Sequence, residues 1–111
     1  MFRRTVLSLA LAAAFSSAAY AQCDTRFQVV NGTDQAVREI YVSSSQTQSW
    51  GNDLLGANVL PPGQTFLVTP SAAGLYDIKV VMMNDQSQEL RQVNVCQISS
   101  VAVTPAGLRA Q

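Results

Sequence analysis

The stretch LYDIKVVMM, residues 75–83, decides the fold class of this chain. Every second position in its first eight residues carries a large apolar side chain: Tyr76, Ile78, Val80 and Met82. A period of two is typical of a β-strand with one buried face. Because Asp77 and Lys79 lie between these residues, we predict that the other face of the strand is solvated at its start.

The residues that follow predict a hairpin with a bulge. Residues 84–87, Asn-Asp-Gln-Ser, are polar and short, so residues 88–95 are expected to fold back as the partner strand. The apolar residues of this second strand change from an even-numbered position, Leu90, to odd-numbered positions, Val93 and Val95. We predict a β-bulge near Arg91 and Gln92, because one extra residue restores the phase.

Four further short runs alternate in the same way: residues 26–31, 37–43, 65–69 and 99–104. Turn residues separate them, notably Asn31-Gly32-Thr33-Asp34 and Pro61-Pro62-Gly63. No segment of the mature chain shows sustained helical periodicity. We therefore predict an all-β fold, a single small antiparallel β-sandwich of six to eight strands within residues 22–104. Residues 105–111 are expected to form a flexible C-terminal tail.

Residues 1–21 have the pattern of a cleaved signal peptide. Arg3 and Arg4 precede an apolar run of about ten residues, too short for a membrane span, which needs about 20. The triplet Ala19-Tyr20-Ala21 is a cleavage site of small residues, apart from its central tyrosine. We expect a bacterial protein that is periplasmic or secreted, exported by the general or by the twin-arginine route.

Cys23 and Cys96 are the only cysteines, and an oxidising compartment favours a disulfide between them. The bond would close a loop of about 74 residues and contribute about 4 kcal/mol by loop entropy. Residues 22–111 carry five basic and seven acidic side chains. This balance argues against nucleic acid or an anionic membrane as the partner.

No motif for catalysis or for a cofactor is present. The chain has no histidine, the commonest general base and metal ligand, and no G-x-S-x-G or S-x-x-K motif. Asn52, Asp53 and Asn58 offer oxygen ligands, but their spacing does not match a calcium-binding loop. We expect neither an enzyme nor a cofactor.

Residues 44–60 are the candidate functional segment, because 17 residues are more than a compact domain usually spends on a connection. Trp50 is the only tryptophan of the chain, and Asn52 and Asp53 follow it. We predict that these three residues, together with Tyr41, could bind a partner. The alternative is a helical turn capped by Ser49, with an apolar plug for the end of the sandwich: Trp50, Leu54 and Leu55.

Four segments carry a resemblance to known proteins: Ile40-Tyr41-Val42-Ser43, Trp50-Gly51-Asn52-Asp53-Leu54-Leu55-Gly56, Leu60-Pro61-Pro62-Gly63 and Tyr76-Asp77-Ile78-Lys79-Val80. Their order resembles a group of small exported proteobacterial proteins, often labelled as twin-arginine (Tat) pathway signal proteins. The resemblance covers roughly residues 26–96. It implies a compact β-rich fold and brings no activity with it.

These features predict a non-catalytic binding module. Its partner would be another periplasmic protein or a component of the cell envelope. The alternative function is a small periplasmic inhibitor of a hydrolase, such as lysozyme or a protease. A β-scaffold stapled by one disulfide, with a protruding loop, suits either function.

Overall fold

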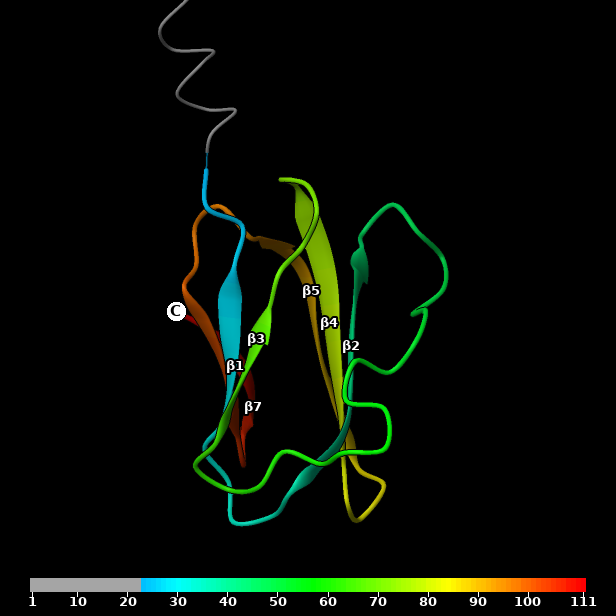
Figure 1. Cartoon of the computed structure of the whole chain (residues 1–111), viewed down its shortest axis with the longest axis vertical. Coiled ribbons are helices and arrows are strands. Elements are labelled where there is room, and N and C mark those ends of the chain that lie inside the picture. The colour runs from blue at the N-terminus through cyan, green and yellow to red at the C-terminus, as the bar shows by residue number, and fades with distance from the viewer. Residues whose placement is uncertain (1–22) are drawn as a thin grey trace, which may run out of the picture.

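The computed structural model describes residues 23–111 and is all-β (Figure 1). Seven strands occur in this part of the chain, and no helix. They are β1 (Phe27–Asn31), β2 (Val37–Ser44), β3 (Thr65–Val68), β4 (Leu75–Met82), β5 (Ser87–Asn94), β6 (Ser100–Thr104) and β7 (Gly107–Ala110). The expected signal peptide, residues 1–21, lies outside the described residues.

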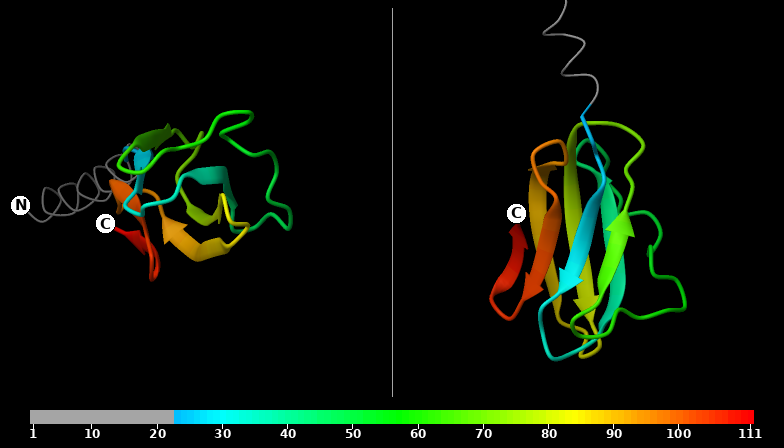
Figure 2. Two further views of the ribbon diagram at one scale, coloured as in Figure 1. Left: turned by 90° about the horizontal axis from the view of Figure 1, so that it is seen from below. Right: turned by 60° about the vertical axis from the view of Figure 1, so that its left-hand side comes forward.

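The strands form two sheets stacked face to face, as the views in Figure 2 show. One sheet has the order β3-β1-β6-β7, and the other has the order β2-β4-β5. The predicted β-sandwich is confirmed, and its ladders are antiparallel except for one. β1 and β6 pair in parallel, because both strands start from the end of the sandwich at which Cys23 and Cys96 are joined.

The core lies between the sheets and is filled by the predicted apolar faces. The side chains of Ile78 and Val80 on β4 are completely buried, as is that of Ile40 on β2. The four-stranded sheet contributes the opposite wall: Phe27, Val29, Val68, Val101, Val103 and Leu108. The period of two in residues 75–83 therefore assigns the buried face of the central strand correctly.

The predicted bulge on β5 is confirmed. Tyr76 pairs with Val93 and Ile78 pairs with Leu90, so that Asp77 faces two residues, Arg91 and Gln92. Gln92 has a positive φ of 57°, a conformation that relatively few residues other than glycine adopt. The bulge turns both Leu90 and Val93 toward the core.

The prediction of a flexible tail over residues 105–111 is wrong. Residues 107–110 form β7, which pairs with β6 and extends the domain to the C-terminus. Leu108 is buried in the core, and the backbone N–H of Gln111 donates to the carbonyl of Ser100 at 2.8 Å. A strand of four residues with a single inward-facing side chain is too short to show a period of two in the sequence.

The turn before β3 and the turn between β1 and β2 have the expected chemistry. Gly63 has a φ of 79° in a turn closed by the Gln64 N–H on the carbonyl of Pro61 at 3.1 Å. The side-chain amide of Asn31 is completely buried and donates to the carbonyls of Gln35 and Leu60 at 2.7 and 3.0 Å. Asn31 therefore anchors the end of the loop between β2 and β3 to β1.

Candidate partner-binding face

Residues 45–59 form a wide loop beside β2, which is an edge strand of its sheet (Figure 1). The loop is fixed to this edge at Ile40. The Ile40 N–H donates to the Asp53 carboxylate at 2.9 Å, and the Ile40 carbonyl accepts from the Leu54 N–H at 2.8 Å. Both backbone groups of Ile40 at the free edge of β2 are thereby paired, so that another chain cannot pair with the edge at this residue.

This attachment places Trp50 over the outer face of the three-stranded sheet. Gly51, directly after the tryptophan, has a φ of 76°, a left-handed conformation that glycine adopts without strain. The ring of Trp50 lies 6.4 Å from the ring of Tyr41 on β2, centroid to centroid, at an interplanar angle of 52°. Such a tilted arrangement is within the favourable range for aromatic pairs.

Two cations from neighbouring strands complete the cluster. The guanidinium of Arg91 on β5 lies 4.8 Å from the centroid of the Trp50 ring, within cation–π distance. The ammonium of Lys79 on β4 lies 5.9 Å from the centroids of both Trp50 and Tyr41. We call these four residues, Tyr41, Trp50, Lys79 and Arg91, the Trp50 face.

The alternative interpretation of this loop as an apolar plug is wrong for two of its three residues. No helical turn forms there, Leu54 is 42% exposed, and Trp50 lies on the outer face. Only Leu55 enters the core, where it is 6% exposed. The attachment at Ile40 turns Leu55 inward and leaves Trp50 outside.

Asp77 faces outward, as predicted, but it is buried rather than solvated. Its side chain is 8% exposed, and it accepts three hydrogen bonds. The Ser45 hydroxyl and the backbone N–H of Gln92 donate to Oδ1 at 2.8 and 2.9 Å, and Arg91 Nη1 donates to Oδ2 at 3.1 Å. The carboxylate therefore binds both residues of the bulge and fixes the guanidinium of Arg91 beside the Trp50 ring.

These contacts shift the ionisation of the groups on the face. The pKa of Asp77 is lowered, chiefly by the hydrogen bond from the Gln92 N–H and then by that from the Ser45 hydroxyl. The pKa of Arg91 is raised by its hydrogen bonds to Glu89 and then to Asp77. The Tyr41 hydroxyl donates to Glu39 at 2.7 Å, and this bond raises the pKa of the phenol.

Asp77 is expected to make stability depend on pH. Because its pKa is lower in the folded than in the unfolded state, its contribution is complete above about pH 4 and is lost as the pH falls through the folded-state pKa. We expect Asp77→Asn to cost about 1–3 kcal/mol at pH 7, the usual price of unpairing a buried polar group. The difference from the wild type should shrink at pH 2–3, measured by urea unfolding across this pH range.

The control for this experiment is Asp34→Asn, which changes an exposed carboxylate that makes no hydrogen bond within residues 23–111. Its unfolding midpoint should follow that of the wild type at every pH. If the cost of Asp77→Asn were the same at pH 7 and at pH 2, the carboxylate would not be ionised in the folded protein.

The structure brings together two of the four residues predicted to bind a partner, Tyr41 and Trp50. Asp53 is occupied by the N–H groups of Ile40 and Leu55, so that its role is to order the loop. Asn52 is exposed on the same loop, and its side chain makes no hydrogen bond within the described residues.

Two members of the face were missed from the sequence, Lys79 and Arg91. The period of two in residues 75–83 carries a signal for Lys79, because it places this lysine on the solvent side, where it pairs with Glu89 in the hairpin. For Arg91 the signal is the phase slip that predicts the bulge. Neither signal indicates that a distant tryptophan covers both cations.

Comparison of the chain with protein-family models, curated proteins and solved structures gives no match.

Proposed function

We propose that this protein is a non-catalytic binding module, exported to the bacterial periplasm or secreted, that holds a component of the cell envelope at the Trp50 face. The observation that carries this proposal is the position of its only tryptophan. Trp50 lies partly exposed on the outside of a sheet, fixed between an aromatic ring and two cations. Large aromatic residues and arginine dominate the binding energy of most interfaces.

The rigidity of the face supports a binding role. Tyr41, Lys79 and Arg91 belong to three hydrogen-bonded strands, and the loop that bears Trp50 is attached to β2 at both backbone groups of Ile40. A partner would therefore meet side chains that are already ordered. Such preorganisation reduces the entropy lost on association.

The acidic groups around the face are engaged in ways that do not suit catalysis. Glu39 accepts from the Tyr41 hydroxyl, Glu89 accepts from Arg91 at 2.6 Å, and Asp77 has three donors. A general acid or base needs a carboxyl group that is free to exchange a proton with a substrate. These bonds favour a non-catalytic role.

Export is the other part of the proposal. It is supported by the pattern of residues 1–21 and by the disulfide, since such bonds persist in oxidising compartments. Within the described part of the chain, no helix is long and apolar enough to cross a membrane.

Trp50→Ala tests the binding role. We expect partner binding to weaken by about 2 kcal/mol or more, roughly 30-fold, because a central aromatic anchor is removed. The midpoint of thermal unfolding should change far less than after the loss of a core tryptophan, which costs about 3–5 kcal/mol. The measurement is quantitative capture from a periplasmic extract by the immobilised protein, beside thermal unfolding of both variants.

Leu67→Ala is the matched control, because Leu67 is 53% exposed on the other sheet. It should leave both capture and stability unchanged. Capture that is the same for wild type and Trp50→Ala would refute the Trp50 face as the binding site. If the captured partner were a lysozyme or a protease whose activity falls on binding, the inhibitor function would replace the envelope component.

A further inference from the structure

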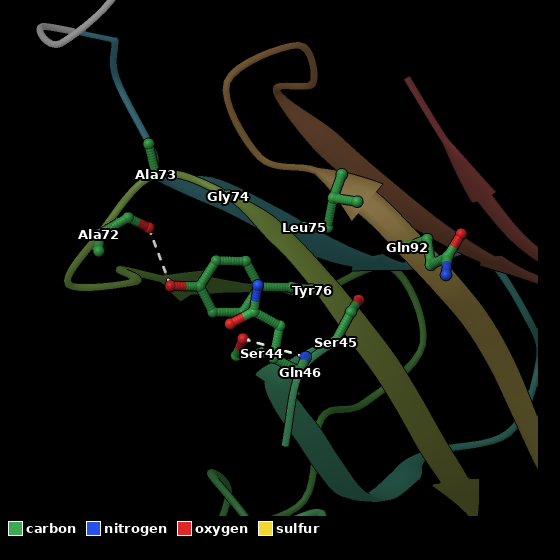
Figure 3. A pocket seen from close by; sticks show the side chains of 9 residues that line it. All are labelled: Ser44, Ser45, Gln46, Ala72, Ala73, Gly74, Leu75, Tyr76 and Gln92. Atoms are coloured by element: carbon green, nitrogen blue, oxygen red, sulfur yellow. Dashed lines mark hydrogen bonds between the residues drawn. The ribbon is translucent and has the colours of Figure 1, made fainter. Parts of the chain in front are cut away.

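A pocket of about 560 Å³ opens at the end of the sandwich where β2 ends and β4 begins (Figure 3). Nine residues line it: Ser44, Ser45, Gln46, Ala72, Ala73, Gly74, Leu75, Tyr76 and Gln92. Its volume lies within the range of small-molecule sites, about 300–1,000 Å³. The pocket is distinct from the Trp50 face, because none of the four residues of that face lines it.

The lining of the pocket carries no formal charge. Its polar groups are hydroxyls and side-chain amides, and the amides of Gln46 and Gln92 make no side-chain hydrogen bond within residues 23–111. An amide and a hydroxyl can each donate and accept, as the hydroxyl groups of a ligand do. Asp77, which accepts from the lining residue Ser45, is paired with Arg91 at 3.1 Å.

The apolar part of the lining consists of one aromatic ring, one leucine and small residues. The Tyr76 ring is held in the pocket by its hydroxyl, which donates to the Ala72 carbonyl at 2.8 Å (Figure 3). Leu75 is 46% exposed, and small residues complete this wall. An aromatic ring beside amide and hydroxyl groups is suited to a ligand whose faces are apolar and whose edges are polar.

From these features we infer that the pocket binds a unit of a neutral saccharide. The inference rests on the proposed function and specifies its partner as an uncharged glycan. A pyranose ring presents C–H groups on its faces, one of which can lie against the Tyr76 ring, and hydroxyl groups around its edge, for Gln46 and Gln92. A charged ligand would find no opposite charge in the lining and would lose hydration without compensation.

A peptide that adds to a strand edge is a poorer fit. This mode of recognition needs free backbone groups at the rim of the pocket. The Ser45 N–H already donates to the Leu75 carbonyl at 2.9 Å, and the Gly74 carbonyl accepts from the Val95 N–H at 3.3 Å. The rim therefore offers side chains for recognition.

Although no residue is shared, the pocket lies next to the Trp50 face, because two of its lining residues are connected to Arg91. Ser45 lines the pocket and bonds to Asp77, whose other oxygen accepts from Arg91. Gln92 lines the pocket and follows Arg91 directly in the chain. A glycan chain with one unit in the pocket can therefore continue toward the aromatic cluster.

The test is an NMR titration of ¹⁵N-labelled protein with three neutral probes: cellotetraose, maltotetraose and tetra-N-acetylchitotetraose. We expect at least one of them to shift the amide signals of Gln46, Tyr76 and Gln92 in a saturable manner. Tetragalacturonate, which is anionic, is the matched probe and should bind more weakly. A probe concentration of about 10 mM is well above a dissociation constant of about 1 mM, which is typical of weak binding. If no neutral probe shifts these signals at that concentration, the inference is overturned.

Variants then locate the site. Gln46→Ala combined with Gln92→Gly should weaken binding of the active probe about tenfold or more, since two amide partners are lost and glycine tolerates the positive φ of residue 92. Gln86→Ala, an exposed glutamine in the turn between β4 and β5, is the control and should bind as the wild type does. Equal binding by all three proteins would also overturn the inference.

The two proposals can fail separately. If no neutral probe binds while capture from the extract still depends on Trp50, the binding module stands and its partner is not a neutral glycan. If a probe binds the pocket while Trp50→Ala captures the same partner as the wild type, the pocket stands and the Trp50 face is not the docking surface.

Discussion

Replacing both Cys23 and Cys96 with alanine is expected to lower the free energy of unfolding by about 2–5 kcal/mol, the usual cost of removing a native disulfide from a small domain. Cys23 precedes β1 of one sheet and Cys96 follows β5 of the other, with their Cα atoms 5.5 Å apart. The bond therefore ties the two sheets together and closes most of the chain into one loop. For a domain of this size, the midpoint of thermal unfolding should fall by roughly 10–30 °C.

The measurement is guanidinium and thermal unfolding of both proteins, with and without a reductant. The midpoint of the double variant should not depend on the reductant. The reduced wild type should unfold at that same midpoint, because both proteins then lack the cross-link. The double variant leaves no free thiol, so that mispairing cannot contribute. A loss of stability below about 1 kcal/mol would show that the packed core suffices without the bond.

Ile78→Ala is expected to have an effect of similar size, about 2–5 kcal/mol. Ile78 is completely buried at the centre of β4, where it pairs with Val42 on β2 and with Leu90 on β5. Its truncation leaves a cavity in the middle of the core, which the stacked sheets can fill only in part. Chemical unfolding of the variant beside the wild type measures this loss.

Leu75→Ala is the matched control in the same strand. Leu75 lies three positions before Ile78, with the opposite parity, and is 46% exposed. Its truncation should change stability by no more than about 0.5 kcal/mol, as is usual at the surface. Equal losses from the two variants would contradict the alternation on which the fold class depends.

The strands could be predicted because their signal is local. A period of two in residues 75–83 states which side chains of β4 meet the core, whatever the partner strands are. The bulge on β5 is a local signal as well, since it appears as a change of phase between Leu90 and Val93. The cysteines at opposite ends of the predicted domain were enough to predict their disulfide.

The binding face could be predicted only in part. The sequence indicates Trp50 because it is the only tryptophan and lies in a long connection, and Tyr41 is predicted beside it. That they meet Lys79 and Arg91 depends on the attachment of the loop to Ile40. The hydrophobic pattern of the sequence does not predict this attachment, because Asp53 accepts from the backbone N–H of Ile40, 13 residues away.

The all-β class, the buried faces of the long strands, the bulge and the disulfide follow from the amino-acid sequence, because each depends on the order of neighbouring residues or on a pair of cysteines. The burial of Asp77, the strand at residues 107–110 and the exposure of Trp50 follow only from the folded structure. Each of these depends on hydrogen bonds or packing between segments far apart in the chain. Such contacts exist only once the sheets have formed, so that no local pattern encodes them.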